Sequence, residues 1–304
     1  MNRSFSIFLL FFLLLLGCTS SDANAKQQNQ SKRSFPFVDV PLMINEETAQ
    51  IKYLRIHFWD KFDFSDESWL KEEDELKRAM FAYLNILSID FAKETSIESL
   101  KQTLQKSSVS PAMELFFTES LYSFLADPNS PLRNEDLQLV LLDFVLASEN
   151  SNDVDLSRAT FDRELLMKNR PGTPAADFSF TLENGRSQRL YSVNAYKIIL
   201  MFYNPDCDAC AYTIDYLKNS AEVKKLIAEN KLKILAIYPD KDLTAWEKYK
   251  QHIPSEWING YDKDQKLEKE LLYDLKAIPT LYLLDSDKKV LLKDAPVEAI
   301  VANL

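Results

Sequence analysis

The chain has 304 residues, 46% of them apolar, so it is long enough for about two domains of roughly 150 residues, each with its own core. It carries 46 acidic and 36 basic residues, for a formal net charge of −10, and no basic run is interleaved with aromatic residues, which disfavours nucleic acid as a partner. Only 4 glycines and 12 prolines argue against a fibrous or loop-rich design. Three cysteines are too few for a disulfide framework, so each needs its own explanation.

Residues 1–17 predict a secretory signal peptide. Arg3 precedes an unbroken apolar run from Ile7 to Leu16, which is short for a bilayer span. The run ends in Leu15-Leu16-Gly17-Cys18, which resembles the lipobox of bacterial lipoproteins. The resemblance implies cleavage before Cys18 and attachment of a diacylglycerol to its sulfur. An ordinary cleaved signal, or a membrane helix that ends in cysteine, is the alternative.

Residues 18–34 predict a lipid anchor followed by a flexible tether. From Thr19 to Ser34 the sequence has no aromatic residue and no Leu, Ile, Val or Met, so this stretch has no apolar surface to bury. We therefore expect a protein that is lipid-anchored on the periplasmic side of the cell envelope, at the outer membrane, with its folded part close to the membrane surface.

Residues 35–168 predict a small all-α domain of five or six helices. Apolar residues recur at helical spacing in several stretches, separated by turn-forming prolines. Pro111 fits the first turn of one helix, and Thr95 with Glu98 predicts a capping box at the start of another. One apolar stripe comprises Leu76, Met80, Tyr83, Leu84, Leu87 and Phe91.

One segment of this domain is unusually aromatic. We interpret it as a core cluster with a hydrogen-bonded His57, and a groove for a peptide or partner is the alternative. Its sequence resembles an N-terminal domain of unknown function that precedes thioredoxin-like domains in lipoproteins of anaerobes, a resemblance that implies no chemistry. The segment contains Tyr53, His57, Phe58, Trp59, Asp60, Phe62, Phe64 and Trp69.

Residues 169–304 predict an α/β domain with a central mixed sheet flanked by helices. Turn-forming residues at 169–174 mark its start. Apolar runs predict its strands, and helical spacing predicts helices after Cys210, around 243–250, over 265–273 and over 297–304. The predicted strands are 177–182, 189–191, 196–203, 233–238, 281–284 and 290–292.

Cys207 and Cys210 lie at a predicted strand-to-helix junction, with two residues between them. Free N–H groups and the helix dipole favour a thiolate at Cys207, while Cys210, one turn later, is shielded but within reach. A zinc site would need two more ligands, yet Cys18 is assigned to the lipid and the chain has only His57 and His252. A structural disulfide across so short a loop would add little stability. A redox-active dithiol is therefore the favoured interpretation.

Together with Ile278-Pro279-Thr280, the dithiol makes residues 170–304 similar to thioredoxin-fold oxidoreductases of the membrane-tethered TlpA-like branch. In that family the proline is cis and lies against the dithiol, and the residue at the position of Ile278 pairs its backbone with the substrate. No cofactor and no metal is expected. Met201 stands where thioredoxin has a buried aspartate, and Thr213 where some relatives have a glutamate, so the sequence identifies no proton shuttle for Cys210.

The predicted function is that of a membrane-anchored extracytoplasmic thiol–disulfide oxidoreductase. Its partners would be protein disulfides or dithiols and a redox partner, with Cys207 attacking and Cys210 resolving. The helix terminus favours the thiolate by about 0.3–1 kcal/mol. Asp206 and Asp208 oppose it by roughly 0.7–3 kcal/mol for a carboxylate about 6 Å away. We therefore expect a reductant or isomerase rather than the primary oxidant. The alternative is a non-catalytic, partner-binding lipoprotein that uses a thioredoxin-like scaffold.

Overall fold

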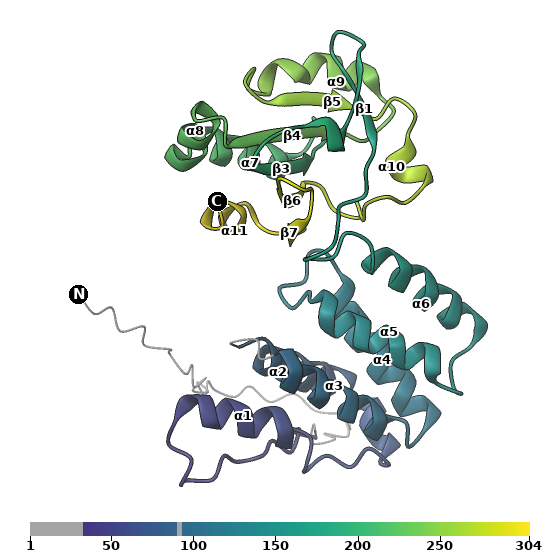
Figure 1. The fold of residues 1–304 in the computed structure, drawn as a ribbon. Coiled ribbons are helices and arrows are strands. Elements are labelled where there is room, and N and C mark those ends of the chain that lie inside the picture. The colour runs from purple at the N-terminus through teal and green to yellow at the C-terminus, as the bar shows by residue number, and fades with distance from the viewer. Residues whose placement is uncertain (1–32, 90–92) are drawn as a thin grey trace, which may run out of the picture. The chain divides into compact units, whose positions relative to one another are not determined.

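A computed structural model describes residues 33–89 and 93–304 (Figure 1). The predicted signal peptide, the proposed lipid anchor Cys18 and nearly all of the tether lie outside the described residues. Residues Ser34–Leu304 form one compact unit. Within the described ranges, no helix combines the length and apolar character needed to cross a membrane.

The N-terminal part of this unit is helical, as predicted. Its first three elements are α1 (Glu47–His57), the 3-10 helix η1 (Glu67–Lys71) and α2 (Glu73–Ser88). The helices α3 (Lys93–Ser107), α4 (Pro111–Ala126), α5 (Glu135–Ala147) and α6 (Asp153–Leu166) follow.

Of the two helix starts predicted from capping signals, the structure confirms the one at Pro111 and contradicts the one at Thr95. Pro111 occupies the first turn of α4, and the Ser110 side chain accepts a hydrogen bond from the Met113 N–H, which caps that helix. The capping box at Thr95 was wrong, because α3 already includes Lys93 and Thr95 therefore lies inside the helix. The buried Ser96 hydroxyl donates to the Leu87 carbonyl of α2, which ties the first turn of α3 to the preceding helix.

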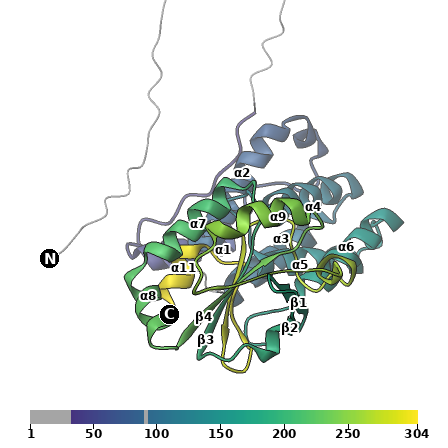
Figure 2. The ribbon, with the colours of Figure 1, turned by 90° about the horizontal axis from the view of Figure 1, so that it is seen from above.

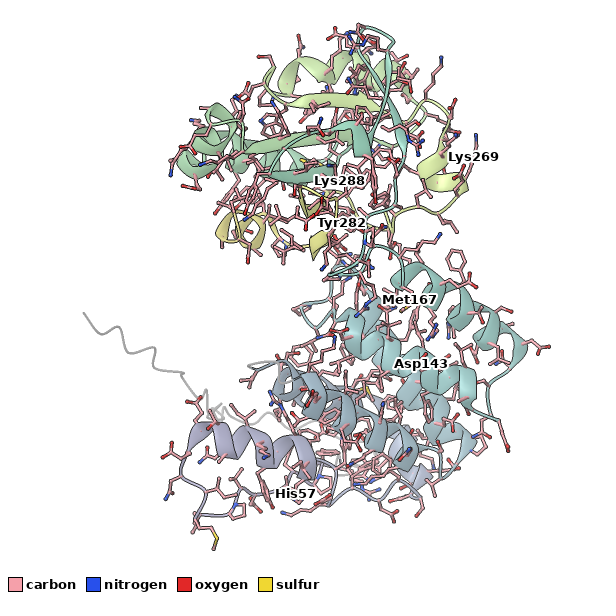
Figure 3. All side chains as sticks on the ribbon, viewed as in Figure 1. His57, Asp143, Met167, Lys269, Tyr282 and Lys288 are labelled. Carbon is pink, nitrogen blue, oxygen red and sulfur yellow. A yellow bond between two sulfur atoms is a disulfide. The ribbon has the colours of Figure 1, made fainter. Side chains whose placement is uncertain are left out.

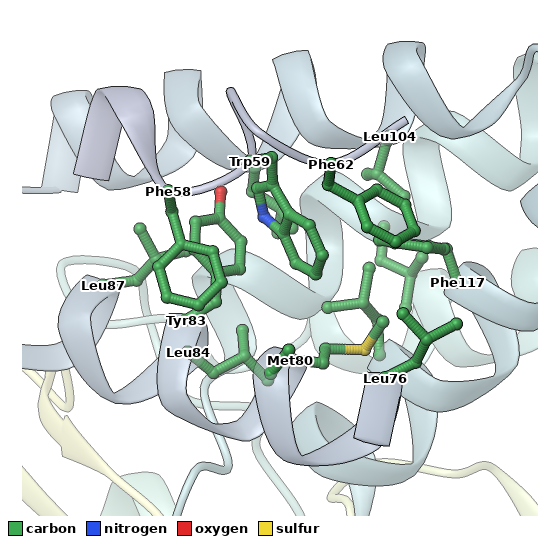
Figure 4. Close-up of a cluster of buried hydrophobic side chains, with 14 of the residues drawn as sticks. Phe58, Trp59, Phe62, Leu76, Met80, Tyr83, Leu84, Leu87, Leu104 and Phe117 are labelled. Atoms are coloured by element: carbon green, nitrogen blue, oxygen red, sulfur yellow. The ribbon is translucent and has the colours of Figure 1, made fainter. Parts of the chain in front are cut away.

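The aromatic segment forms the core of the helical part (Figure 4). Trp59 meets Phe117 of α4 edge-on, with ring centroids 5.1 Å apart, an arrangement that aromatic quadrupoles favour. His57 lies half-buried at the edge of the cluster, its Nδ1 2.6 Å from an Asp60 carboxylate oxygen. The core interpretation is confirmed for the five buried aromatic residues Phe58, Trp59, Phe62, Phe64 and Trp69.

The C-terminal part is built on a seven-stranded mixed sheet in the order β2-β1-β5-β4-β3-β6-β7. Central strand β3 pairs in parallel with β4 and antiparallel with β6. The strands are β1 (Ser179–Leu182), β2 (Ser187–Arg189), β3 (Lys197–Phe202), β4 (Leu232–Tyr238), β5 (Ile258–Tyr261), β6 (Thr280–Asp285) and β7 (Val290–Lys293). The mixed sheet of the predicted fold class is confirmed.

Each face of the sheet has its own core, because successive strand residues point to opposite sides. On β3, Ile199 and Met201 join one cluster, which includes residues of α7 (Asp208–Asn219), α8 (Ala221–Ala228), α9 (Leu243–Tyr249) and α11 (Val297–Ala302). Helix α7 packs against α8 and α11 (Figure 2). The opposite face carries a second cluster that includes Tyr282 of β6 (Figure 3) and Leu267 of α10 (Lys266–Lys269).

Three features of this sheet domain differ from the prediction. The strand expected over 189–191 lies earlier, as β2, and Leu190–Ser192 form a 3-10 helix. Strand β5 was missed, because Ile258-Asn-Gly-Tyr261 alternates too weakly to stand out from a loop. The helix expected over 265–273 was too long, since α10 ends at Lys269 and Leu271 adopts a left-handed backbone with φ 47°. A left-handed residue cannot continue a right-handed helix, so the chain turns away here.

Candidate dithiol site

Cys207 is the N-cap residue of α7, directly after the loop that leaves β3. Its sulfur accepts a hydrogen bond from the backbone N–H of Cys210 at 3.1 Å. The two cysteines form a disulfide. The Cys207 side chain is half-buried, whereas Cys210 is fully buried in the core cluster below the helix. The pair therefore has one sulfur within reach of a partner and one protected from it.

The loop before β6 completes the site. The Ile278–Pro279 peptide bond is cis, in agreement with the resemblance. The Ile278 carbonyl oxygen lies 3.4 Å from the Cys207 sulfur, and Ile278 packs against the cluster that holds Cys210. The structure thus brings together all four residues predicted for exchange and substrate binding.

Acidic residues flank Cys207 and also follow β4. Asp206 and Asp208 are both exposed on either side of Cys207. Burial raises the pKa of Tyr238 to about 12, with further contributions from the negative charges of Asp240, Asp242 and Asp206. Asp240 and Asp242 follow β4, and their charges act on Tyr238 together with that of Asp206, which sequence reasoning did not foresee.

Positions 201 and 213 hold no ionisable group that could serve as a proton shuttle for Cys210. Met201 is buried in β3 and Thr213 is buried in α7. Tyr203, which packs in the same cluster as Cys210, donates a hydrogen bond to Asn259 of β5 at 2.9 Å. Burial raises the pKa of Tyr203, so its phenol stays protonated at neutral pH. In the sequence, Tyr203 is only a tyrosine at the end of a buried strand, so its place beside the dithiol cluster and its hydrogen bond to Asn259 could not be predicted.

Neither histidine lies in a cluster suited to a metal. Among the residues that the structure describes, no group of three or more His, Cys, Asp or Glu could hold a metal ion. His57 is engaged with Asp60, and the exposed His252 lies against the ring of Tyr249, with centroids 4.9 Å apart.

Known proteins resemble both parts of the chain. Residues 17–169 match a family described as a domain of unknown function (DUF5106), and residues 196–290 match one described as thioredoxin-like. A thioredoxin-like protein from Bacteroides caccae is 37% identical, with a TM-score of 0.84 over 89% of this chain and 98% of that one. The chain is a thioredoxin-like protein of the DUF5106 family.

Further structures resemble the thioredoxin-like part of this DUF5106 protein. The C-terminal domain of an uncharacterized protein from Bacteroides fragilis is 46% identical, with a TM-score of 0.44 over 45% of this chain and 97% of that one. The thioredoxin domain of a thiol-disulfide oxidoreductase from Bacteroides vulgatus is 19% identical, with a TM-score of 0.39 over 44% of this chain and 94% of that one. No curated protein matches the sequence.

Proposed function

We propose that the protein is a thiol–disulfide oxidoreductase in which Cys207 and Cys210 exchange with disulfides of other proteins. The observation that carries the proposal is the disulfide at the start of α7, with the half-buried Cys207 sulfur beside the Ile278 carbonyl. A substrate chain that pairs with the Ile278 backbone would present its own disulfide to Cys207. Cys210, buried behind it, meets only a disulfide that has already reached Cys207.

The exchange consists of two thiolate displacements. In the reduced protein, the Cys207 thiolate attacks one sulfur of the substrate disulfide, which forms a mixed disulfide and releases the other substrate sulfur as a thiolate. Cys210 then loses its proton to solvent and attacks the Cys207 sulfur, which releases the second substrate thiolate. The substrate gains two electrons and the Cys207–Cys210 disulfide is restored. A dithiol redox partner must then reduce that disulfide.

The charges around Cys207 favour a reductant or isomerase over a primary oxidant. A strong oxidant requires a well-stabilised thiolate, because that thiolate lowers the energy of the reduced form. Here the helix terminus and the Cys210 N–H stabilise the thiolate. Two exposed carboxylates, Asp206 and Asp208, oppose them from adjacent positions. The net stabilisation is therefore small.

The proposed location rests on the sequence of the N-terminal segment. A lipid on Cys18 would hold the protein at the periplasmic face of the outer membrane, because acyl chains add roughly 0.8 kcal/mol per buried methylene group. The exchange would then act on proteins of that compartment, where disulfides form and persist.

The direct test is to trap substrates with a Cys210→Ser variant in the cells that make the protein. Without the resolving sulfur, mixed disulfides between Cys207 and substrate proteins should accumulate and disappear on reduction. The matched control is the Cys207→Ser/Cys210→Ser double variant, which should trap none. If both variants give the same pattern while the fold is intact, the protein is not an exchange enzyme, and the non-catalytic scaffold becomes the better explanation.

A further inference from the structure

The segment that leads to Ile278 is held from the helical part of the chain. Between α10 and β6, residues 270–279 form neither helix nor strand. The Lys168 ammonium donates to the carbonyls of Glu270 at 3.2 Å and Leu271 at 2.7 Å, and the Asn169 side chain donates to the Leu272 carbonyl at 2.7 Å. Three carbonyl groups at the start of this segment are therefore bound by the two residues at the junction of the helical and sheet parts.

Helix α6 holds the same segment at a second point, which is nearer to Ile278 along the chain. The side chain of Asp162 on α6 is only 5% exposed, and one of its oxygens lies 3.2 Å from the Lys276 ammonium. Its other oxygen accepts a hydrogen bond from the Tyr122 hydroxyl of α4 at 2.5 Å. The Lys276 ammonium also lies 3.8 Å from the buried carboxylate of Asp274.

This pairing strongly favours one position of the segment. A buried carboxylate is costly unless charged or hydrogen-bonding groups satisfy it, and Lys276 is the cation that reaches Asp162 here. Moving Lys276 away would leave both Asp162 and Asp274 without that cation. Lys276 precedes Ile278 by two residues, and the Ile278 carbonyl lies 3.4 Å from the Cys207 sulfur. A shift at Lys276 would therefore move the backbone group that faces the reactive sulfur.

We propose that Asp162 is a positioning residue for disulfide exchange, which acts through Lys276 on the substrate-pairing backbone at Ile278. The helical part of the chain then has a role in the reaction, because it positions the Ile278 backbone with which a protein substrate pairs. The proposal rests on the exchange function proposed above. It predicts that a loss of the ion pair weakens the use of protein substrates and spares the intrinsic reactivity of the dithiol.

Two reactions measured on the same proteins test this. The first is reduction of the Cys207–Cys210 disulfide by dithiothreitol, which needs no substrate alignment. The second is turnover of a disulfide-bonded protein such as insulin, with KM and kcat obtained separately. If the unaltered protein fails in the first reaction, the proposed function is wrong. If it succeeds in both, the variants decide the role of Asp162.

For Asp162→Asn we expect kcat/KM for the protein disulfide to fall about 2- to 30-fold, mainly through KM, the range typical of mutations that act through a neighbouring element. The rate with dithiothreitol should stay within about twofold. Lys276→Gln, whose replaced side chain is 39% exposed, removes the pair from the other side and should give the same pattern. Lys276→Arg, which keeps the charge, should restore most of the loss.

The matched control is Asp143→Asn, at a residue of α5 labelled in Figure 3. It breaks the exposed ion pair between Asp143 and Arg163 of α6. It should change neither reaction. If Asp162→Asn and Lys276→Gln fold and leave KM unchanged, or slow both reactions equally, the positioning role is refuted.

Discussion

The sulfur of Cys207 lies 3.4 Å from the carbonyl oxygen of Ile278, although 70 residues separate the two along the chain. Strands β3 and β6 pair antiparallel, so the last residue of β3 lies beside the first residue of β6, at one end of the strands. The loop to the dithiol follows β3 at that end, and the loop with the cis proline leads into β6 at the same end. This pairing places a reactive sulfur beside a backbone group suited to align a substrate.

Removal of the carboxylates beside Cys207 should make its thiolate more stable. Each exposed carboxylate about 6 Å from the sulfur opposes the thiolate by roughly 0.7 kcal/mol in water, so Asp206→Asn and Asp208→Asn should each lower the pKa of Cys207 by about 0.5. The ultraviolet absorbance of the thiolate in the reduced protein measures that pKa. The difference between variant and unaltered protein should shrink in 1 M salt, since exposed charges are screened. If Cys207 in the unaltered protein has a pKa near the ~3.5 of DsbA, rather than the ~7 of thioredoxin, the proposed direction of exchange is contradicted.

The contact between Lys293 and Glu135 should make a large contribution to stability. The Lys293 side chain is 3% exposed, and its ammonium donates to the Glu135 carboxylate at 3.0 Å and to the Leu166 carbonyl at 2.9 Å. Lys293→Met leaves Glu135 without this cation, so the free energy of unfolding should fall by about 3 kcal/mol, as for other broken buried pairs. Urea unfolding measures it. Lys77→Met, at an exposed pair with Glu73, is the control and should cost less than about 1 kcal/mol.

Glu135 should also make stability depend on pH in an unusual direction. Burial raises its pKa above the ordinary value of 4.5, although Lys293 acts in the opposite sense. The folded protein then binds this proton more tightly than the unfolded chain, so stability falls as pH rises through 4.5 and up to the raised pKa. The free energy of unfolding of the unaltered protein, relative to Glu135→Gln, should therefore decrease as the pH rises above 4.5. An increase over that range would mean that the pairing with Lys293 outweighs burial.

Gly260 in β5 should not tolerate a larger residue. A methyl group there would lie 2.8 Å from a ring carbon of Phe180 and 3.0 Å from the Thr181 carbonyl oxygen. Gly260→Ala should therefore destabilise the protein by about 1–3 kcal/mol through overpacking. Denaturant unfolding is the measurement. A neutral effect would show that β1 and β5 are not packed as closely as described.

The lipid anchor is tested by Cys18→Ser. The unaltered protein should fractionate with membranes and incorporate radiolabelled palmitate. The variant should do neither, because the proposed acyl chains supply the membrane affinity. Palmitate incorporation by the variant, or membrane association that does not depend on Cys18, would contradict the anchor.

Sequence patterns predicted the elements that carry strong local signals. The buried run of β3 and the dithiol at its end follow from local chemistry and spacing, whereas the role of the proline before β6 comes from the resemblance to the thioredoxin-fold family. The aromatic segment was placed in a core because so many large apolar residues in one stretch need burial. The predicted helix extended beyond α10 because Leu271 adopts a left-handed conformation, which the sequence does not indicate at a leucine.

Features that depend on contacts between distant parts of the chain could not be predicted from sequence patterns. Asp162 is an ordinary acidic residue on a helix until Lys276, more than a hundred positions later, is found beside it. Asp240 and Asp206 likewise act on the same residue, Tyr238, only because β3 pairs with β4. Such residues are identified by the tertiary structure alone, because nothing in their local spacing distinguishes them.

The reduction potential of the Cys207–Cys210 pair tests the central claim most directly. Oxidised protein is equilibrated with dithiothreitol buffers of defined potential, and the fraction of free thiol is measured together with the circular dichroism of the fold. We predict reversible exchange of two electrons, with a potential nearer the ~−270 mV of thioredoxin than the ~−120 mV of DsbA. A folded protein whose disulfide does not exchange at any potential, or exchanges near −120 mV as DsbA does, would contradict the account.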